Sequence, residues 1–265
     1  MREMSISDIQ SVSVKILKIV DDFCTANNIS YSLGYGSLIG AIRHKGCIPW
    51  DDDIDIIMTR PEYEKFYRLF NESEISKNTY VKLFAPELGN CYFPIARVCD
   101  MKRTRVYRFY QWSEENVGVW IDIFVIDGIG GVGLRNLMPN AMKACVAHVS
   151  LSSKFDFYQN IKNAIKRVMW CRYNRKDIID QYLHEINQVD FNSSQEVCNV
   201  CSPYKNDIHQ RFIFDTYQRV PFQEINVSII SEYDIYLRKL YGDYMKLPPK
   251  EKQVRGHSAN TYWWL

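Results

Sequence analysis

The sequence contains no run of about 18 uncharged apolar residues, the length that a membrane-spanning helix requires. Residues 1–10 are polar and mixed in charge, without the apolar stretch of a secretory signal. Basic residues number 33 and acidic residues 31, so the formal net charge of +2 provides no strong field for nucleic acid. These absences predict a cytoplasmic protein that binds no nucleic acid, and they leave open a peripheral contact with the inner face of the membrane.

The sequence has enough apolar residues to form a hydrophobic core, because 46% of its 265 residues are hydrophobic and 14% are aromatic. This excludes a disordered chain and allows one large domain or two small ones. The eight cysteines are expected to be free and mostly buried, since no export signal precedes them. Cys198 and Cys201 form the one close pair. A zinc site there would need two further ligands, for which His209 is a single candidate.

Hydrophobic periodicity predicts an α+β protein. Apolar residues recur at three- and four-residue steps from Ile6 to Phe23, which predicts a helix capped by Ser5 or Ser7 and ended at Asn27. Strands are expected at 29–33, 53–58, 80–85, 93–99, 104–109 and 117–126. The last of these is the most apolar and should lie at the centre of a mixed sheet, with flanking helices at 38–44 and 62–70.

Beyond Gly133 the pattern becomes mostly helical. Helices are predicted at 134–153, 157–173, 176–188 and 229–241, with short strands at 196–201 and 211–214. We therefore expect a core formed by residues 1–133 and a helical C-terminal subdomain, residues 134–265, packed on it.

The densest chemical signal is the run Trp50-Asp51-Asp52-Asp53-Ile54-Asp55. Neighbouring carboxylates repel one another and strands disfavour Asp, so this cluster indicates a site where a cation offsets the charge. In a strand, Asp53 and Asp55 would share one face, roughly 7 Å apart at their Cα atoms, and their oxygens suit Mg²⁺ or Mn²⁺. The alternative is a solvated acidic turn, which accounts for Asp51 and Asp52 but not for a carboxylate among isoleucines.

Two further segments are candidates for the same site. Gly34-Tyr35-Gly36-Ser37 leads into a helix whose N–H groups can approach a phosphate, with Ser37 as a cap or phosphate contact; a simple tight turn is the alternative. Its glycine spacing does not match the dinucleotide-binding G-x-G-x-x-G pattern. Asp122, inside the apolar strand 117–126, is costly to bury unpaired and is expected to face the same cation, whereas Asp127 is predicted to be a turn residue.

Residues 35–55, which run from Tyr-Gly-Ser to Asp-Asp-Asp-Ile-Asp, resemble the signature of the LicD family, a family that also includes the fukutin-related proteins. The similarity continues at Arg97, at residues 120–124 and at residues 241–249, and so spans most of the chain.

The resemblance implies a nucleotidyltransferase-like (polymerase-β-type) catalytic core. Gly36 and Ser37 would form its turn, Asp53 and Asp55 its Asp-x-Asp strand, and Asp122 its third carboxylate. It also implies transfer of a phospho-alcohol, namely phosphocholine, phosphoethanolamine or a polyol phosphate, from a CDP-activated donor to a sugar hydroxyl of a glycan or lipid-linked glycan, with release of CMP. Mg²⁺ or Mn²⁺ on the three carboxylates would offset charge on the transferring group, and proton removal is the alternative role of Asp122.

Basic residues near these motifs are candidate contacts for the donor's phosphates, with a solvated surface position as an equal alternative. They are Arg43, His44, Lys45 and Arg97. Tyr35 or Trp50 is expected to stack on the cytosine, although Trp50 also fits a core position. Family members often carry Phe-Glu-Gly where this chain has Phe222-Gln223-Glu224, so a site role for Gln223 or Glu224 stays open.

Two other classes of function are alternatives. One is a transferase of the same fold that moves the nucleotide itself onto a protein or small molecule. The other is a non-catalytic binding module, against which the three intact carboxylates argue.

Residues 154–176 carry seven basic residues and one acidic residue, with apolar residues at helical spacing. This pattern is typical of a basic amphipathic helix that lies on an anionic membrane and binds it weakly and in a salt-sensitive way. A helix whose apolar face packs on the core is the slightly favoured alternative.

Overall fold

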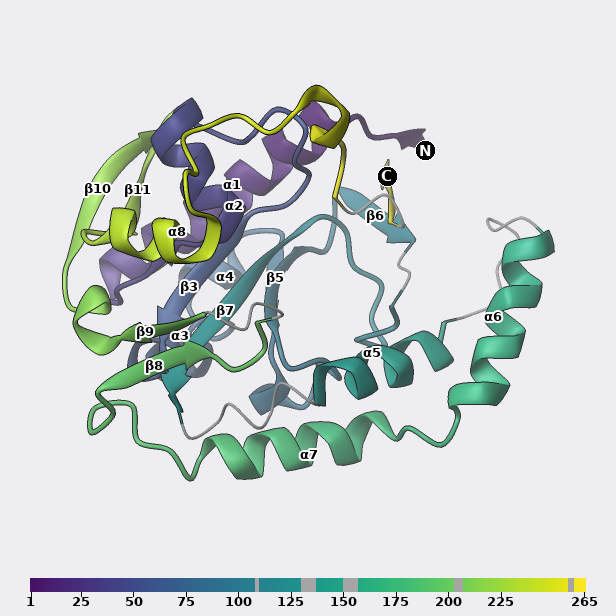
Figure 1. Ribbon diagram of the computed structural model, residues 1–265. Helices are drawn as coiled ribbons and strands as arrows, with labels where there is room; N and C mark the ends of the chain where they lie inside the picture. Colours follow the sequence, from purple (N-terminus) through teal and green to yellow (C-terminus); the bar gives the residue numbers. More distant parts are fainter. Residues whose placement is uncertain (108–109, 130–136, 150–156, 203–206, 257–259) are drawn as a thin grey trace.

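The computed structural model describes residues 1–107, 110–129, 137–149, 157–202, 207–256 and 260–265. The largest sheet has the strand order β2 (Ser32–Leu33), β3 (Asp55–Thr59), β7 (Trp120–Gly128), β5 (Ala96–Asp100) and β4 (Val81–Phe84). From β7 it branches to β8 (Glu196–Asn199), which pairs with β9 (Ile208–Gln210). β3 and β7 run parallel and the other pairs are antiparallel, so the predicted mixed sheet and its central apolar strand are confirmed (Figure 1).

Helices from the first half pack beside this sheet. They are α1 (Ile6–Ala26), α3 (Arg60–Leu69) and α4 (Glu74–Lys77). Of the two predicted caps, Ser5 is the one that caps α1: it forms a capping box in which its hydroxyl accepts from the Asp8 N–H and the Asp8 carboxylate accepts from the Ser5 N–H. α1 packs against β5 and β7, and α3, which follows β3 directly, packs against β3 and β7.

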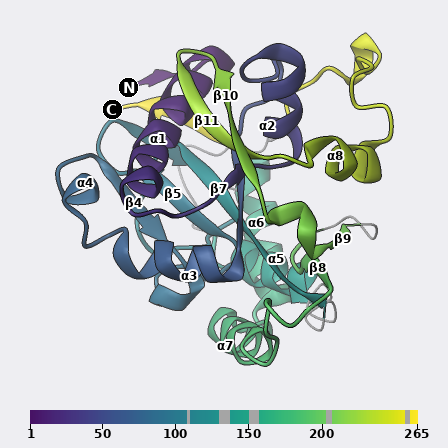
Figure 2. The ribbon, with the colours of Figure 1, turned by 90° about the vertical axis from the view of Figure 1, so that its left-hand side faces the viewer.

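The prediction of a mostly helical second half is not confirmed. It contains the helices α5 (Leu137–Ala147), α6 (Phe157–Trp170), α7 (Arg175–Ile186) and α8 (Tyr233–Tyr241), but also β8, β9, β10 (Tyr217–Phe222), β11 (Ile225–Ile230) and β12 (Thr261–Trp264). The helix expected at 229–241 begins only at Tyr233, because the β-branched residues before it form a hairpin with β10. Figure 2 shows this hairpin beside α1.

Several other element boundaries differ from the predictions. The strand expected at 29–33 shortens to β2, and the strand expected at 211–214 is the 3₁₀ helix η4 (Arg211–Phe214). Two more 3₁₀ helices are η2 (Pro86–Leu88) and η5 (Lys250–Lys252). Asp127 is not a turn residue: it lies within β7, is buried, and accepts hydrogen bonds from Arg60 Nε and Nη2 at 2.6 and 3.0 Å.

The predicted boundary between residues 133 and 134 lies outside the described residues, and the division into two subdomains stays a prediction. Strand pairing joins segments from both sides of it. β8 pairs with β7, and β12 lies between β1 (Arg2–Glu3) and β6 (Thr104–Tyr107) in a small sheet. Buried apolar residues from both halves form one cluster. None of the described helices combines the length and apolarity needed to cross a bilayer.

Candidate active site

The Gly-Ser segment is helical rather than a loop. Gly34 is the N-cap of α2 (Tyr35–Ile39), and the chain continues as the π-helix η1 (Gly40–His44). Ser37 does not cap this helix; its Oγ accepts a hydrogen bond of 2.9 Å from the backbone N–H of Asp55. A Cβ atom placed on Gly36 would lie 2.9 Å from Asp51 Oδ2. The two motifs that the sequence analysis singles out therefore touch each other at two points.

The run of three aspartates precedes a strand. β3 begins at Asp55, so the prediction that Asp53 is itself a strand residue is wrong. Nevertheless Asp51, Asp52 and Asp53 each direct a carboxylate oxygen to within 4.8 Å of the others, which makes them a potential cation-binding group. The side chain of Asp52 is fully buried, with Arg255 Nε 2.5 Å from its Oδ2. Asp52 is therefore already neutralised by the protein.

Strand register brings Asp122 and Arg97 beside this group. Asp55 lies opposite Asp122 in the parallel pair β3–β7, and Arg97 lies opposite Asp122 in the antiparallel pair β5–β7. Residues opposite one another in neighbouring strands share a face of the sheet, so the three form a row across it. Arg97 Nε is 2.8 Å from Asp122 Oδ1, and Trp120 Nε1 donates to Asp122 Oδ2 at 3.1 Å.

The carboxylates influence one another strongly. The pKa of Asp55 is raised well above its ordinary value, first by burial and then by the negative charges of Asp53, Asp122 and Asp51, while Arg97 opposes the shift. The ionised form of Asp55 is therefore disfavoured, and a cation bound nearby would favour it. Oxygen ligands gathered in this way suit a hard divalent cation such as Mg²⁺ or Mn²⁺. With Asp52 engaged by Arg255, the remaining aspartates are the better candidates to hold it.

Arg97 is a buried residue, so the alternative of a solvated surface position is wrong for it. Its guanidinium carbon lies 4.6 Å from the ring centre of Trp112, 5.3 Å from that of Phe93 and 5.8 Å from that of Trp120. Among the described residues its Nη1 has no hydrogen-bond partner. The aromatic rings and Asp122 thus hold a cationic donor in place at the row of carboxylates.

The basic residues 43–45 have different surroundings. Arg43 Nη1 donates to the carbonyl oxygens of Tyr244 and Lys246 at 2.6 and 3.3 Å, which ties the family-like segment 241–249 to the first motif. Burial lowers the pKa of Arg43, and burial together with Arg43 lowers the pKa of His44. Lys45 is exposed, with a left-handed backbone φ of 57°. Arg43 is therefore at least partly a structural anchor, and phosphate contact by the three residues stays a prediction.

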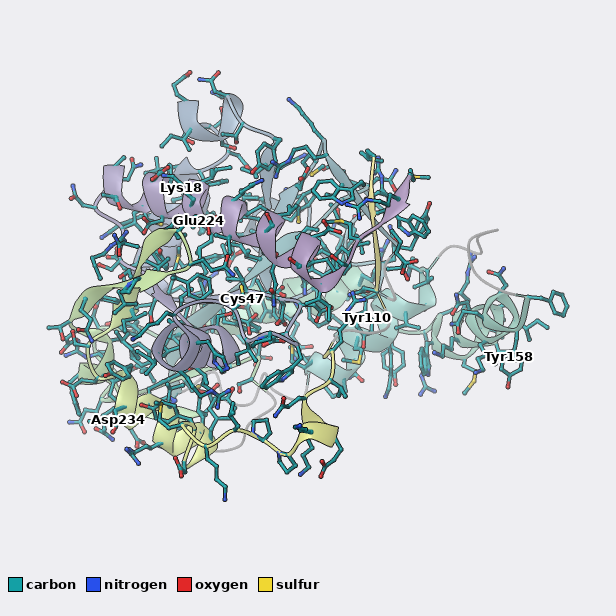
Figure 3. The ribbon with its side chains drawn as sticks, turned by 90° about the horizontal axis from the view of Figure 1, so that it is seen from above. Lys18, Cys47, Tyr110, Tyr158, Glu224 and Asp234 are labelled. Carbon is teal, nitrogen blue, oxygen red and sulfur yellow. The ribbon has the colours of Figure 1, made fainter. Side chains whose placement is uncertain are left out.

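The tip of the β10–β11 hairpin lies on the loop between the two motifs. Gln223, whose φ is 52°, donates its N–H to the carbonyl of Lys45 at 2.7 Å. A Cβ atom on Gly46 would lie 2.7 Å from Gln223 Cγ, so this approach depends on the glycine. On the loop itself, the pKa of Cys47 is raised to about 12, by burial first, then by the negative charges of Asp51 and Asp53, and in smaller part by Glu224 (Figure 3 labels Cys47 and Glu224). The hairpin tip is therefore a neighbour of the site.

Tyr35 is not available to stack on a base. It is buried, its hydroxyl donates to Asp207 Oδ2 at 2.9 Å, and it accepts from Asn199 Nδ2 at 2.7 Å. Trp50 is half-buried, with its ring centre 6.1 Å from that of His44, and its predicted role stays open.

Two residues near the acidic group carry no signal in the sequence. Arg255 reaches Asp52 from a segment about 200 residues further along the chain, and Tyr262 of β12 is buried beside the cluster. The pKa of Tyr262 is raised by burial first and then by Asp52, Asp122 and Asp53. Neither residue lies in a motif, so only the fold reveals that they contact the site.

The structure gives no support to a zinc site at Cys198 and Cys201. Within the described ranges, Asp51–Asp53 are the only clustered metal-ligand group, and the two cysteines have no part in it. Cys201 Sγ donates to the Pro94 carbonyl at 3.0 Å, while His209 Nε2 lies 2.9 Å from Asp207 Oδ1. All eight cysteines are free and six of them are buried, as predicted.

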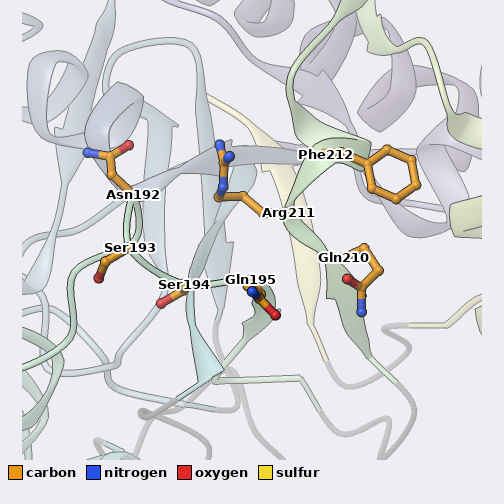
Figure 4. Close-up of a pocket in the computed structure, with 7 residues that line it drawn as sticks. All are labelled: Asn192, Ser193, Ser194, Gln195, Gln210, Arg211 and Phe212. Carbon is orange, nitrogen blue, oxygen red and sulfur yellow. The ribbon is translucent and has the colours of Figure 1, made fainter.

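One surface pocket contains none of the predicted site residues. Figure 4 shows the side chains that line it: Asn192, Ser193, Ser194, Gln195, Gln210, Arg211 and Phe212. None of them is a predicted site residue, and Arg211 is ion-paired with Asp215 at 3.2 Å.

The comparison with known proteins agrees with the motifs. Residues 28–143 match the family described as "LicD/FKTN/FKRP, nucleotidyltransferase domain". The chain is 28% identical over 276 residues to the lipopolysaccharide cholinephosphotransferase LicD of Haemophilus influenzae, and the alignment covers 99% of each protein. An uncharacterized protein of Rickettsia typhi is 44% identical over 52 residues, which are 19% of this chain and 17% of that protein. These findings agree with the resemblance to the LicD family that the motifs indicate.

Proposed function

We propose that this protein transfers a phospho-alcohol, with phosphocholine as the first candidate, from a CDP-activated donor to a sugar hydroxyl of a glycan or lipid-linked glycan. The observation that carries the proposal is the row formed by Asp55, Asp122 and Arg97 beside the Asp51–Asp53 group. Support comes from similarity along nearly the whole chain to a lipopolysaccharide cholinephosphotransferase.

A divalent cation fits these residues, since the donor set consists of carboxylate oxygens whose mutual repulsion a cation would relieve. Asp53 and Asp55 would hold it, with Asp51 as a further candidate and Asp122 beside them. When bound, Mg²⁺ or Mn²⁺ would offset negative charge on the diphosphate of the donor.

In the proposed reaction, the oxygen of the sugar hydroxyl forms a bond to the phosphorus that carries the alcohol, and the hydroxyl proton is released to solvent. The bond from that phosphorus to the CMP oxygen breaks, and CMP leaves with the electron pair. The positive charge of buried Arg97, beside Asp122, would favour the anionic donor at this row. Both oxygens of Asp122 already contact Arg97 or Trp120, which favours a positioning role for Asp122 over removal of the hydroxyl proton.

The test incubates the purified protein with CDP-choline, CDP-ethanolamine or CDP-ribitol and a bacterial lipooligosaccharide, with Mg²⁺ or with EDTA. Mass spectrometry follows the acceptor, and chromatography follows CMP. We expect the acceptor to gain one phospho-alcohol for each CMP released, in the presence of Mg²⁺ only. Asp55→Asn should reduce this by at least a hundredfold, whereas Asp22→Asn, which removes an exposed carboxylate of α1, should not.

The same measurement separates the alternatives. An acceptor that gains CMP while the free phospho-alcohol appears would identify a nucleotidyltransferase. Donor binding without any product, across the three donors, would favour a non-catalytic binding module.

A further inference from the structure

The helix α6 presents its apolar side chains to solvent. Phe157 is 82% exposed, Val168 78% and Met169 60%, whereas Asn163 is 2% exposed. Asn163 accepts a hydrogen bond from Gln159 Nε2 at 3.0 Å, so a polar face is the one turned inward. The prediction that the apolar face packs on the core is therefore wrong.

The exposed apolar residues, together with the half-buried Ala164, form one continuous face of α6. At 3.6 residues per turn, seven positions occupy less than half of the helix circumference. They are Phe157, Tyr158, Ile161, Ala164, Ile165, Val168 and Met169. The last four line a shallow depression that is almost entirely apolar. α6 contacts α5 and stands away from the sheet, and Tyr158 lies at the outer edge of the molecule (Figures 1 and 3).

Basic side chains border this face. α6 contains Lys162, Lys166 and Arg167 and no Asp or Glu. The same helical geometry places Lys162 at one edge of the apolar face and Arg167 beyond the other. Lys162 Nζ lies 4.2 Å from the ring centre of Tyr158, an arrangement in which the charge lies beside an aromatic ring and stays accessible.

This combination identifies the occupant of the apolar face. A second copy of α6 would bring like charges together at the edges of the contact, which is unfavourable. An anionic lipid surface fits both the apolar face and its basic border. The apolar side chains would contact the acyl chains, and the lysine and arginine side chains would contact the lipid phosphates. Exposed apolar faces of this kind are uncommon on soluble proteins without a partner.

We propose that α6 is a membrane-docking helix, which inserts its apolar face into the surface of an anionic bilayer. Membrane docking depends on α6 alone and not on the transfer reaction proposed above. An experiment can therefore refute either proposal and leave the other intact.

The test measures co-sedimentation of the full chain with vesicles of phosphatidylglycerol and phosphatidylcholine, and with phosphatidylcholine alone. The parent should bind the anionic vesicles and lose most binding in high salt. Phe157→Ser with Val168→Ser, and separately Lys162→Glu with Arg167→Glu, should each weaken binding at least tenfold.

Two matched controls use exposed residues elsewhere. Phe212→Ser removes an exposed aromatic ring of η4, and Lys250→Glu with Lys252→Glu makes the same charge change on η5. Neither should alter binding. Urea unfolding should give all variants the parent's midpoint, because the altered side chains are exposed.

Three results would overturn the proposal. They are equal binding by the parent and the serine double variant, equal binding to both kinds of vesicle, and a parent dimer in sedimentation velocity that the serine double variant converts to monomer. The last result would assign the apolar face to self-association. Transfer to a lipid-free oligosaccharide, measured in parallel, reports the enzyme activity independently of docking.

Discussion

Replacing Arg97 by Met would test whether the row of charges across the sheet is held together as described. Arg97 is buried, pairs with Asp122 at 2.8 Å and lies 4.6 Å from the ring centre of Trp112. Met fills much of the same space but leaves the Asp122 carboxylate beside the other aspartates without its cation. Removal of one partner of a buried ion pair costs about 3–5 kcal/mol. At about 2–4 °C for each kcal/mol, the melting temperature should fall by roughly 6–20 °C.

The assay is urea unfolding followed by tryptophan fluorescence, and the comparison that matters is a double-mutant cycle. Asp122→Asn in the Arg97→Met background should recover about 2 kcal/mol of the free energy of unfolding, because the uncompensated charge is then gone. Arg97→Lys keeps the charge but loses the planar stacking on the rings, so its loss should be intermediate. A loss below about 1 kcal/mol for Arg97→Met, or strict additivity in the cycle, would refute the coupling between Arg97 and Asp122.

Three other substitutions have defined outcomes. Arg255→Met should lower the free energy of unfolding by about 3 kcal/mol, because the fully buried carboxylate of Asp52 loses its cation; urea unfolding measures this, and addition of Asp52→Asn should restore part of it. In Gly40→Ala the new Cβ would lie 2.5 Å from the carbonyl oxygen of Gly46, so we expect a loss of about 1–3 kcal/mol together with reduced transfer, and unchanged stability would contradict the close approach. Asp53→Asn should abolish transfer with the urea midpoint at or above that of the parent, because one repelling carboxylate is removed; normal turnover at saturating donor would exclude Asp53 from the site.

Local sequence patterns were sufficient to predict the parts of the candidate site that lie close together in the chain. The alternation of Asp and Ile, the glycines before it and the lone Asp122 in an apolar strand predict neighbouring elements, and strand pairing places Asp55 opposite Asp122. The start of the strand was predicted two residues too early. Residues 51–53 precede the strand instead, with their carboxylate oxygens within 4.8 Å of one another and Asp52 in contact with Arg255.

Long-range partners were beyond the reach of sequence patterns. No motif marks Arg255 or Tyr262. Tyr262 lies in β12, which pairs with β6, and Arg255 precedes this strand and contacts Asp52. The β10–β11 hairpin was not predicted, and the helix expected at 229–241 included the last two residues of β11. Periodicity identified the apolar side of α6. It could not show whether this side faces the core or the solvent, since the same spacing of apolar residues occurs in both cases.

The position of β12 has a consequence for synthesis of the protein on the ribosome. β12 is the middle strand of its small sheet, and its two neighbours, β1 and β6, pair with it and not with each other. β1 and β6 therefore have no partner strand in this sheet until residue 264 has left the exit tunnel. Arg255 and Tyr262 arrive at the same late stage, so the buried Asp52 carboxylate stays without its cation throughout earlier translation. A nascent chain stalled before residue 255 should thus lack an ordered aspartate cluster, which would form only after residues 255–264 have emerged from the ribosome.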